Sequence, residues 1–167
     1  AYAYVTREGA GRSPANAGMN GHENAGIIIK AGKSFMERHG VEEGELVALE
    51  EYLPCGHCEW CRMGEFRHCW LTDTHNNPNP SRQAGGYSQY LYLPPNVVIH
   101  KVPQTMSADE AALALPIGNG VQWACVEGEA GPGKTIVIQG PGSKGLGCTI
   151  AAKKFGATNV IVTGLTK

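Results

Sequence analysis

Four closely spaced cysteines constrain the fold of this chain more than any other feature. Cys55, Cys58, Cys61 and Cys69 form the pattern C-x2-C-x2-C-x7-C. Four thiolates set this close bind Zn²⁺ tetrahedrally, and a site closed by four sulfur ligands is structural rather than catalytic because it leaves no position for water. Residues 54–82 show little apolar periodicity, so metal binding would replace the missing core. The pattern therefore predicts a zinc-held lobe over residues 54–70.

Two other interpretations of the cysteines stay open. Disulfides are typical of secreted chains, but nothing in this sequence has the pattern of a secretory leader. The tetrapeptide at 55–58, Cys-Gly-His-Cys, is by itself the redox motif of protein disulfide isomerases, which requires a strand before it and a helix starting at it. The zinc interpretation makes His57 a loop residue and not a ligand. Cys125 and Cys148 are expected to be buried small hydrophobes.

Composition and charge narrow the class of protein. The chain has 167 residues, of which 42% are hydrophobic and 17% charged, and its formal net charge is −1. These values favour a soluble globular protein with no general attraction to nucleic acid or to an anionic membrane. No apolar run approaches the roughly 20 residues that span a bilayer. We therefore expect a cytoplasmic protein that binds neither nucleic acid nor membrane.

The pattern of predicted elements changes along the chain. The first 20 residues are expected to form a loop, and the next part of the chain to be β-rich, with strands at 26–29, 46–49, 87–93 and 97–99. Ser107 is a good N-cap for a helix that Pro116 would interrupt. A strand at 135–139, a helix at 145–155 and a strand at 159–163 then form a βαβ unit, which implies a parallel sheet. We place the domain boundary near residue 105.

A glycine-rich turn links the first of these later strands to its helix. It reads Gly140-Pro141-Gly142-Ser143-Lys144-Gly145, which is G-x-G-x-x-G in the setting that a dinucleotide site requires. Gly140 would make the tight turn, Gly142 would let the backbone approach a pyrophosphate, and Gly145 would let the helix pack on the sheet. The pyrophosphate would lie at the helix N-terminus, where free N–H groups and the helix dipole favour an anion.

The order of these motifs carries a family resemblance. The four-cysteine pattern, with Gly21-His22-Glu23 before it and Gly85-Gly86-Tyr87 after it, resembles the zinc-containing medium-chain dehydrogenases. That family includes alcohol, polyol, glucose and threonine dehydrogenases. The resemblance implies a mixed fold: a GroES-like catalytic domain over 1–105, with its N-terminal part missing, and the first part of a Rossmann domain over 106–167.

The resemblance also implies a second, catalytic zinc and a set of site residues. In that family this zinc polarises the alcohol oxygen and lowers its pKa. His22 would be its histidine ligand, and Glu23 a ligand or a close neighbour. The cofactor, NAD or NADP, would lie against the glycine turn, with residues Gly140, Gly142, Ser143, Lys144, Gly145 and Gly164 in contact with it.

The sequence departs from the family pattern at several places. The expected upstream cysteine ligand is absent, because no cysteine precedes Cys55. The junction at 115–120 carries no Cys, Asp or Glu, and Asn119 is the only side chain there able to coordinate. Either Glu23 completes the site, or the metal is weak or absent. Thr163-Gly164 stands where an acid would hold the ribose of NAD, which favours NADP slightly. The chain stops at Lys167, so we expect that it represents part of a longer protein.

These observations favour one function and leave two others open. The first is a zinc-dependent oxidoreductase that transfers a hydride between an alcohol or polyol and NAD(P), acting on a small-molecule substrate as a homodimer or homotetramer. The second is a zinc-free NADPH reductase or non-catalytic paralogue of the same fold. The third is an interaction module braced by the four-cysteine zinc. Two zinc ions per full-length chain would favour the first.

Overall fold

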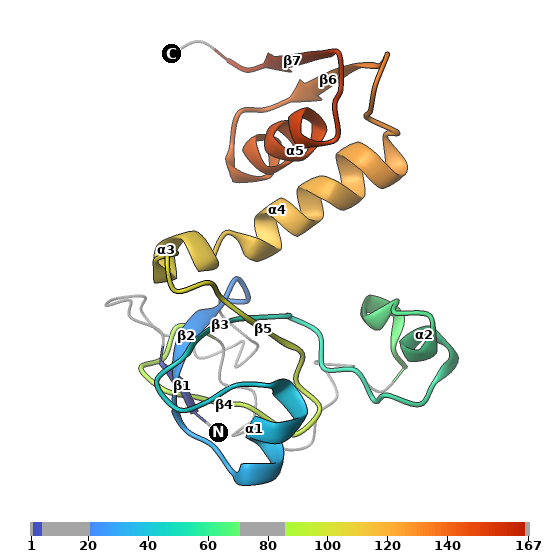
Figure 1. The fold of residues 1–167 in the computed structure, drawn as a ribbon. Coiled ribbons are helices and arrows are strands. Elements are labelled where there is room, and N and C mark those ends of the chain that lie inside the picture. Colours follow the sequence, from blue (N-terminus) through green and yellow to red (C-terminus); the bar gives the residue numbers. More distant parts are fainter. Residues whose placement is uncertain (1, 5–20, 71–85, 166–167) are drawn as a thin grey trace, which may run out of the picture. The chain divides into compact units, whose positions relative to one another are not determined.

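The computed structural model describes residues 2–4, 21–70 and 86–165, and the chain divides into two compact units (Figure 1). Unit 1 covers Ala1–Ala112 and unit 2 covers Leu113–Lys167. The first unit holds the β-rich part of the chain and the second holds the strand–helix–strand part, so the predicted mixed fold is confirmed. The assignment of domains at 1–105 and 106–167 stays a prediction.

Unit 1 is built on a five-stranded sheet with the order β4-β1-β2-β3-β5, in which every neighbouring pair is antiparallel. Its strands are β1 (Tyr2–Tyr4), β2 (Ala25–Lys30), β3 (Leu46–Leu49), β4 (Leu91–Tyr92) and β5 (Ile99–Lys101). The central strands β2 and β3 carry Ile28 and Val47, both 0% exposed, which pack with Val41 into one apolar cluster. Burial of such branched side chains stabilises the sheet by about 1.5–3 kcal/mol each.

The connection between β2 and β3 contains helix α1 (Lys33–His39). The helix ends at Gly40, whose left-handed backbone (φ 63°) closes the last turn with an N–H bond to the Met36 carbonyl. Phe35 packs against the apolar cluster on the sheet. This connection therefore completes part of the core while leaving the other ends of β2 and β3 open.

The register of β2 against β3 is important for the functional site. Ala25 pairs with Ala48 and Ile27 pairs with Leu46, and the Leu49 N–H extends the ladder by donating to the Asn24 carbonyl at 2.9 Å. Because the two strands are antiparallel, the residues just before β2 and those just after β3 leave the sheet at the same end.

The remaining helices of unit 1 are short. Helix α2 (Glu59–Arg62) and the 3-10 helix η1 (Phe66–His68) lie in the four-cysteine lobe, and α3 (Ala108–Ala111) follows the sheet. Ser107 caps α3 through a capping box, in which its hydroxyl accepts from the Glu110 N–H while the Glu110 carboxylate accepts from the Ser107 N–H.

Unit 2 contains a two-stranded parallel sheet with helices against it (Figure 1). Its elements are α4 (Ala114–Gly120), the π-helix η3 (Val121–Glu127), β6 (Thr135–Gln139), α5 (Ser143–Lys154) and β7 (Asn159–Thr163). Strands β6 and β7 pair in parallel from Thr135↔Asn159 to Gln139↔Thr163. Helices α4 and α5 meet where a Cβ on Gly120 would overlap the backbone of Gly147, so only glycine fits at that crossing.

Several expectations about elements were wrong in detail. The first 20 residues were expected to be loop, but residues 2–4 form β1. The strand expected over 87–93 is only Leu91–Tyr92, and that expected over 97–99 runs over Ile99–Lys101.

The break between the helices lies earlier than expected. The helix that Ser107 begins ends at Ala111, and Pro116 lies in the first turn of α4 instead of interrupting a helix. The first four N–H groups of a helix have no partner within it, so proline is tolerated there. Of the described helices, none is long and apolar enough to cross a membrane.

Candidate metal and cofactor sites

The four cysteines of the lobe converge on one point. The sulfur atoms of Cys55, Cys58, Cys61 and Cys69 all lie within 4.8 Å of one another. Zinc–thiolate bonds of about 2.3 Å in a tetrahedron place neighbouring sulfur atoms about 3.8 Å apart. The Cys55 and Cys61 sulfur atoms are 3.8 Å apart, so the geometry fits a zinc ion. All six cysteines described in the structure are free thiols.

Backbone N–H groups surround this sulfur cluster. Cys58 N–H donates to Cys55 Sγ at 3.3 Å, Cys61 N–H to Cys58 Sγ at 3.4 Å, and Cys55 N–H to Cys69 Sγ at 3.4 Å. Such bonds favour the thiolate form that a metal requires. Because the chain turns between them, cysteines three residues apart place their sulfur atoms on the same side of the loop.

The thiols of the cluster differ in acidity. The Cys61 N–H bond to the Cys58 sulfur is the main reason that the pKa of Cys58 lies below its ordinary value. Removal from water raises the pKa of Cys61 to about 12. Thiols this close do not all ionise together without a cation, so binding of a metal must displace protons.

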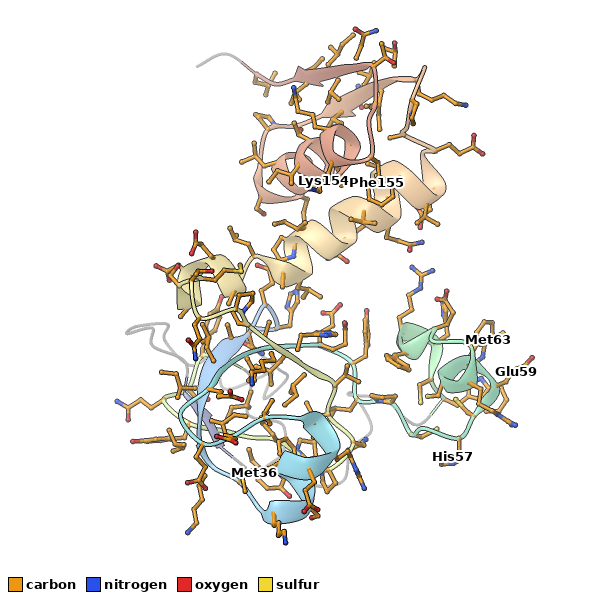
Figure 2. The ribbon with its side chains drawn as sticks, viewed as in Figure 1. Met36, His57, Glu59, Met63, Lys154 and Phe155 are labelled. Atoms are coloured by element: carbon orange, nitrogen blue, oxygen red, sulfur yellow. The ribbon has the colours of Figure 1, made fainter. Side chains whose placement is uncertain are left out.

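His57, between the first two cysteines of the lobe, lies outside the sulfur cluster. His57 is exposed, and its Nδ1 lies 2.9 Å from the Cys55 carbonyl oxygen. Figure 2 shows His57, Glu59 and Met63 at the outer side of the lobe. Among the described residues, the metal-binding group contains only the four cysteines, in agreement with the interpretation of His57 as a loop residue.

The Gly-His-Glu motif lies in a turn before β2, and the segment beginning at Gly86 holds that turn. The Gly86 N–H donates to the Gly21 carbonyl at 2.8 Å, and Asn24 Nδ2 donates to the same carbonyl at 3.4 Å. Gly21 has φ 81°, and a Cβ there would lie 3.1 Å from the Tyr87 ring. Glycine at this position therefore meets both a conformational and a steric requirement. This contact explains why Gly-Gly-Tyr accompanies Gly-His-Glu in the sequence.

His22 and Glu23 are both exposed in this turn. His22 Nε2 lies 3.7 Å from Glu51 Oε2, so the structure brings a carboxylate beside the histidine that the sequence interpretation did not consider. No third His, Cys, Asp or Glu among the described residues joins these two in a metal-binding group. The assignments of His22 and Glu23 as metal ligands remain proposals.

The glycine turn has the backbone that its sequence predicts. Gly140 has φ 97°, which only glycine adopts readily, and a Cβ on Gly145 would overlap the Gly140 carbonyl. No atom lies within 4 Å of the position that a Cβ on Gly142 would occupy. Gly142 is the N-cap of α5 and has no side chain to accept from the first N–H groups. An approaching anion finds open space at the start of a helix there.

The end of β7 lies beside this turn. The Gly140 N–H donates to the Thr163 carbonyl at 2.7 Å, and a Cβ on Gly164 would lie 2.9 Å from the ring of Pro141. The parallel pairing of β6 and β7 thus brings Gly164 to the turn that precedes it by more than twenty residues of chain. Ser143 and Lys144 are the first residues of α5.

Comparison with known proteins identifies the family. The family model described as "Alcohol dehydrogenase GroES-like domain" matches residues 3–104. The chain belongs to this family, which confirms the resemblance carried by the motifs.

Individual relatives agree. The chain is 38% identical over 151 residues to a probable alcohol dehydrogenase of Mycobacterium tuberculosis, covering 87% of this chain and 41% of that protein. It is 37% identical over 145 residues to the sorbitol dehydrogenase of Bacillus subtilis, covering 87% and 39%. The solved alcohol dehydrogenase of Thermotoga maritima superposes with a TM-score of 0.66 at 29% identity, covering 84% of this chain and 41% of that one. The chain therefore spans about two fifths of the length of these relatives.

Proposed function

We propose that the protein is a zinc-dependent dehydrogenase that transfers a hydride between an alcohol or polyol and NAD(P). The convergence of four cysteine sulfur atoms within 4.8 Å, in a chain of this family, is the observation that carries the proposal. Relatives named alcohol dehydrogenase and sorbitol dehydrogenase support a small alcohol or polyol as the substrate.

In this proposal two groups of residues bind two different zinc ions. Cys55, Cys58, Cys61 and Cys69 hold a structural zinc that orders the lobe. His22, with Glu23 beside it, holds a catalytic zinc, which when bound polarises the alcohol oxygen and lowers its pKa. These residues thereby orient the reacting group of the substrate at the end of the β2–β3 pair.

The glycine turn binds the cofactor. Gly140 turns the chain, Gly142 leaves room for the pyrophosphate, and the N–H groups at Ser143, Lys144 and Gly145 face it at the start of α5. Gly164 lies where the adenosine ribose would be read. We further propose that unit 2 begins a Rossmann domain, and that the protein acts in the cytoplasm as a homodimer or homotetramer.

Two variants of the full-length protein test the proposal together. His22→Ala should abolish alcohol oxidation while NAD(P) affinity and one zinc per chain remain, because the cofactor turn and the lobe are untouched. Gly142→Val should weaken both cofactors together and leave both zinc ions bound. Zinc content, cofactor titration and steady-state oxidation rates provide the readouts. Near-normal turnover in His22→Ala would refute the metal assignment.

One observation favours the second candidate, a zinc-free reductase or non-catalytic paralogue. Glu51 lies 3.7 Å from His22, but among the described residues no group of three or more candidate ligands includes His22. One zinc per full-length chain, together with NADPH binding, would favour that candidate. One zinc with no NAD(P) binding would favour an interaction module braced by the lobe.

A further inference from the structure

Glu51 follows β3 at the end of the sheet where His22 precedes β2. Paired residues of β2 and β3 are Ala25 with Ala48 and Ile27 with Leu46, and the Leu49 N–H bond to Asn24 continues the ladder. Continued by three more residues from Ala25 and Ala48, the same antiparallel register sets His22 against Glu51. Directly opposed residues have Cβ atoms about 4.5–5.5 Å apart. The paired strands end at Ala25 and Ala48, and His22 and Glu51 lie just beyond them at the same end of the sheet.

The separation of the two side chains suits a shared metal better than a hydrogen bond. His22 Nε2 and Glu51 Oε2 are 3.7 Å apart, which is beyond the range of a direct hydrogen bond. Two ligand atoms bound to one tetrahedral zinc at about 2.0–2.2 Å lie about 3.4 Å from each other. The observed distance differs from this value by only a few tenths of an ångström.

The surroundings of Glu51 restrain it. Its side chain is 21% exposed, against 50% for His22, and after burial the Glu51 carboxylate is the next cause that raises the pKa of the neighbouring Tyr52. Hydrogen-bonded carboxylates next to a metal-binding histidine are typical of metal centres. The imidazole remains open to incoming ions while the carboxylate is held beside it.

We infer that Glu51 is an oxygen ligand of the metal that His22 holds. The inference rests on the proposed function and extends it to a residue that neither the motifs nor the family resemblance assigned. The segment 115–120 contains no Cys, Asp or Glu that could serve as a charged ligand. The carboxylate of Glu51, after β3, would supply that ligand instead.

Zinc content of the full-length protein tests the inference without reference to activity. Wild type should keep two zinc ions per chain after dialysis against metal-free buffer, and Glu51→Gln should keep only the one in the lobe. Competition with a chelator should show that the amide lowers zinc affinity at the second site by more than about 100-fold. Glu51→His should retain two zinc ions, because imidazole is also a zinc ligand.

Glu50→Gln is the matched control. It makes the same chemical change at the neighbouring residue, whose N–H donates to the Val98 carbonyl, and it should keep both zinc ions. The zinc of the lobe and the circular dichroism spectrum report on folding in each variant. If Glu51→Gln unfolds, the variants Glu51→His and Glu51→Asp test the ligand role of Glu51, because both new side chains can bind zinc. Loss of the second zinc from both folded variants would contradict that role.

Three results overturn the inference, and they are distinguishable. Two zinc ions in both wild type and Glu51→Gln, at equal affinity, would mean that the pair is only a surface contact, while the proposed function stands. Loss of zinc from Glu51→Gln and Glu50→Gln alike would indicate a general effect of charge. A single zinc in wild type that His22→Ala does not remove would refute the catalytic-metal proposal itself.

Discussion

The four-cysteine lobe and the His22–Glu51 pair present metal-binding atoms in opposite ways. The lobe draws its four sulfur atoms from one stretch of fifteen residues, and short turns bring them within 4.8 Å. His22 precedes β2 and Glu51 follows β3, with helix α1 between the two strands, and the two side chains lie 3.7 Å apart. The lobe depends on local spacing, whereas the pair depends on the fold of the sheet.

The two cofactor features differ in the same way. The turn from Gly140 to Gly145 is one continuous motif with its own left-handed residue at φ 97°. Gly164 reaches that turn only through the parallel pairing of β6 with β7. Changing one residue of a continuous motif, such as the lobe or the glycine turn, should therefore abolish binding by the whole motif. Changing a residue brought in by the fold, such as Glu51 or Gly164, should affect its own contact and leave its partners in place.

Loss of one lobe ligand should have the largest effect. Cys58→Ser removes a sulfur that accepts the Cys61 N–H and lies within the cluster. Structural zinc contributes on the order of 10 kcal/mol to the folding of small zinc-held units, so the variant should lose one zinc and its lobe should become sensitive to protease. His57→Ala, in the same loop but outside the cluster, should lose neither. A metal-free wild type with a Cys55–Cys58 disulfide would refute the zinc interpretation.

Zinc affinity of the lobe should fall steeply with acid. Cys58 has a pKa lowered by the Cys61 N–H bond, whereas the pKa of Cys61 is raised by desolvation to about 12. The Cys61 thiol therefore carries its proton at pH 7, and zinc must displace that proton when it binds. Each proton displaced makes affinity fall up to about tenfold per pH unit.

Calorimetry in two buffers of different ionisation enthalpy measures the protons released. Titration of Zn²⁺ into metal-free protein should show a heat that depends strongly on the buffer, and Cys58→Ser should remove that dependence. A heat that is the same in both buffers would mean that zinc binds without displacing thiol protons, and would contradict a protonated Cys61 thiol in the metal-free lobe.

A charge at Gly164 should change cofactor choice by a moderate amount. Gly164→Asp would accept hydrogen bonds from ribose hydroxyls and repel a 2′-phosphate, shifting the ratio of NADP and NAD dissociation constants toward NAD by roughly tenfold or more. A Cβ at this position also presses on Pro141 at 2.9 Å. Gly164→Ala is the control, because it introduces the steric contact without the charge. If the ratio is the same in both variants, Gly164 does not face the ribose.

The smallest effect should come from Gly86→Ala. A Cβ there would overlap the Asn24 side chain, which lies against the turn that carries His22. Crowding of this kind costs about 1–3 kcal/mol, so Tm should fall by several degrees and zinc at His22 should bind more weakly, with the lobe zinc unchanged. Addition of Asn24→Ala should restore part of the loss, because the pair is in contact. Simple additivity of the two changes would contradict this account.

Most of the local structure could be predicted from the sequence. The strands β3, β6 and β7 coincide with runs of aliphatic residues that were read as strands at the same positions, such as Thr135–Gln139. The four cysteines and the glycine turn were found because their chemistry depends on spacing along the chain. In each case neighbours in sequence are also neighbours in space.

What sequence reasoning missed depends on contacts between distant segments. Strand β1 pairs with β2 and β4, but its three residues follow no pattern that separates them from a loop. Helix α4 runs through Pro116, Gly118 and Gly120, which lower helix propensity, and the close packing of Gly120 on Gly147 compensates. Glu51 could have been found only if the register of β2 against β3 had been inferred first.

The hairpin that joins β2 to β3 also determines where this chain tolerates changes in length. Residues 31–45 lie between the strands, so insertions or deletions at the exposed end of α1 would leave His22 facing Glu51. A single residue added within β3 would instead turn Glu51 to the opposite face. We expect homologous chains to vary in length between these strands and to keep a constant number of residues from Ala48 to Glu51.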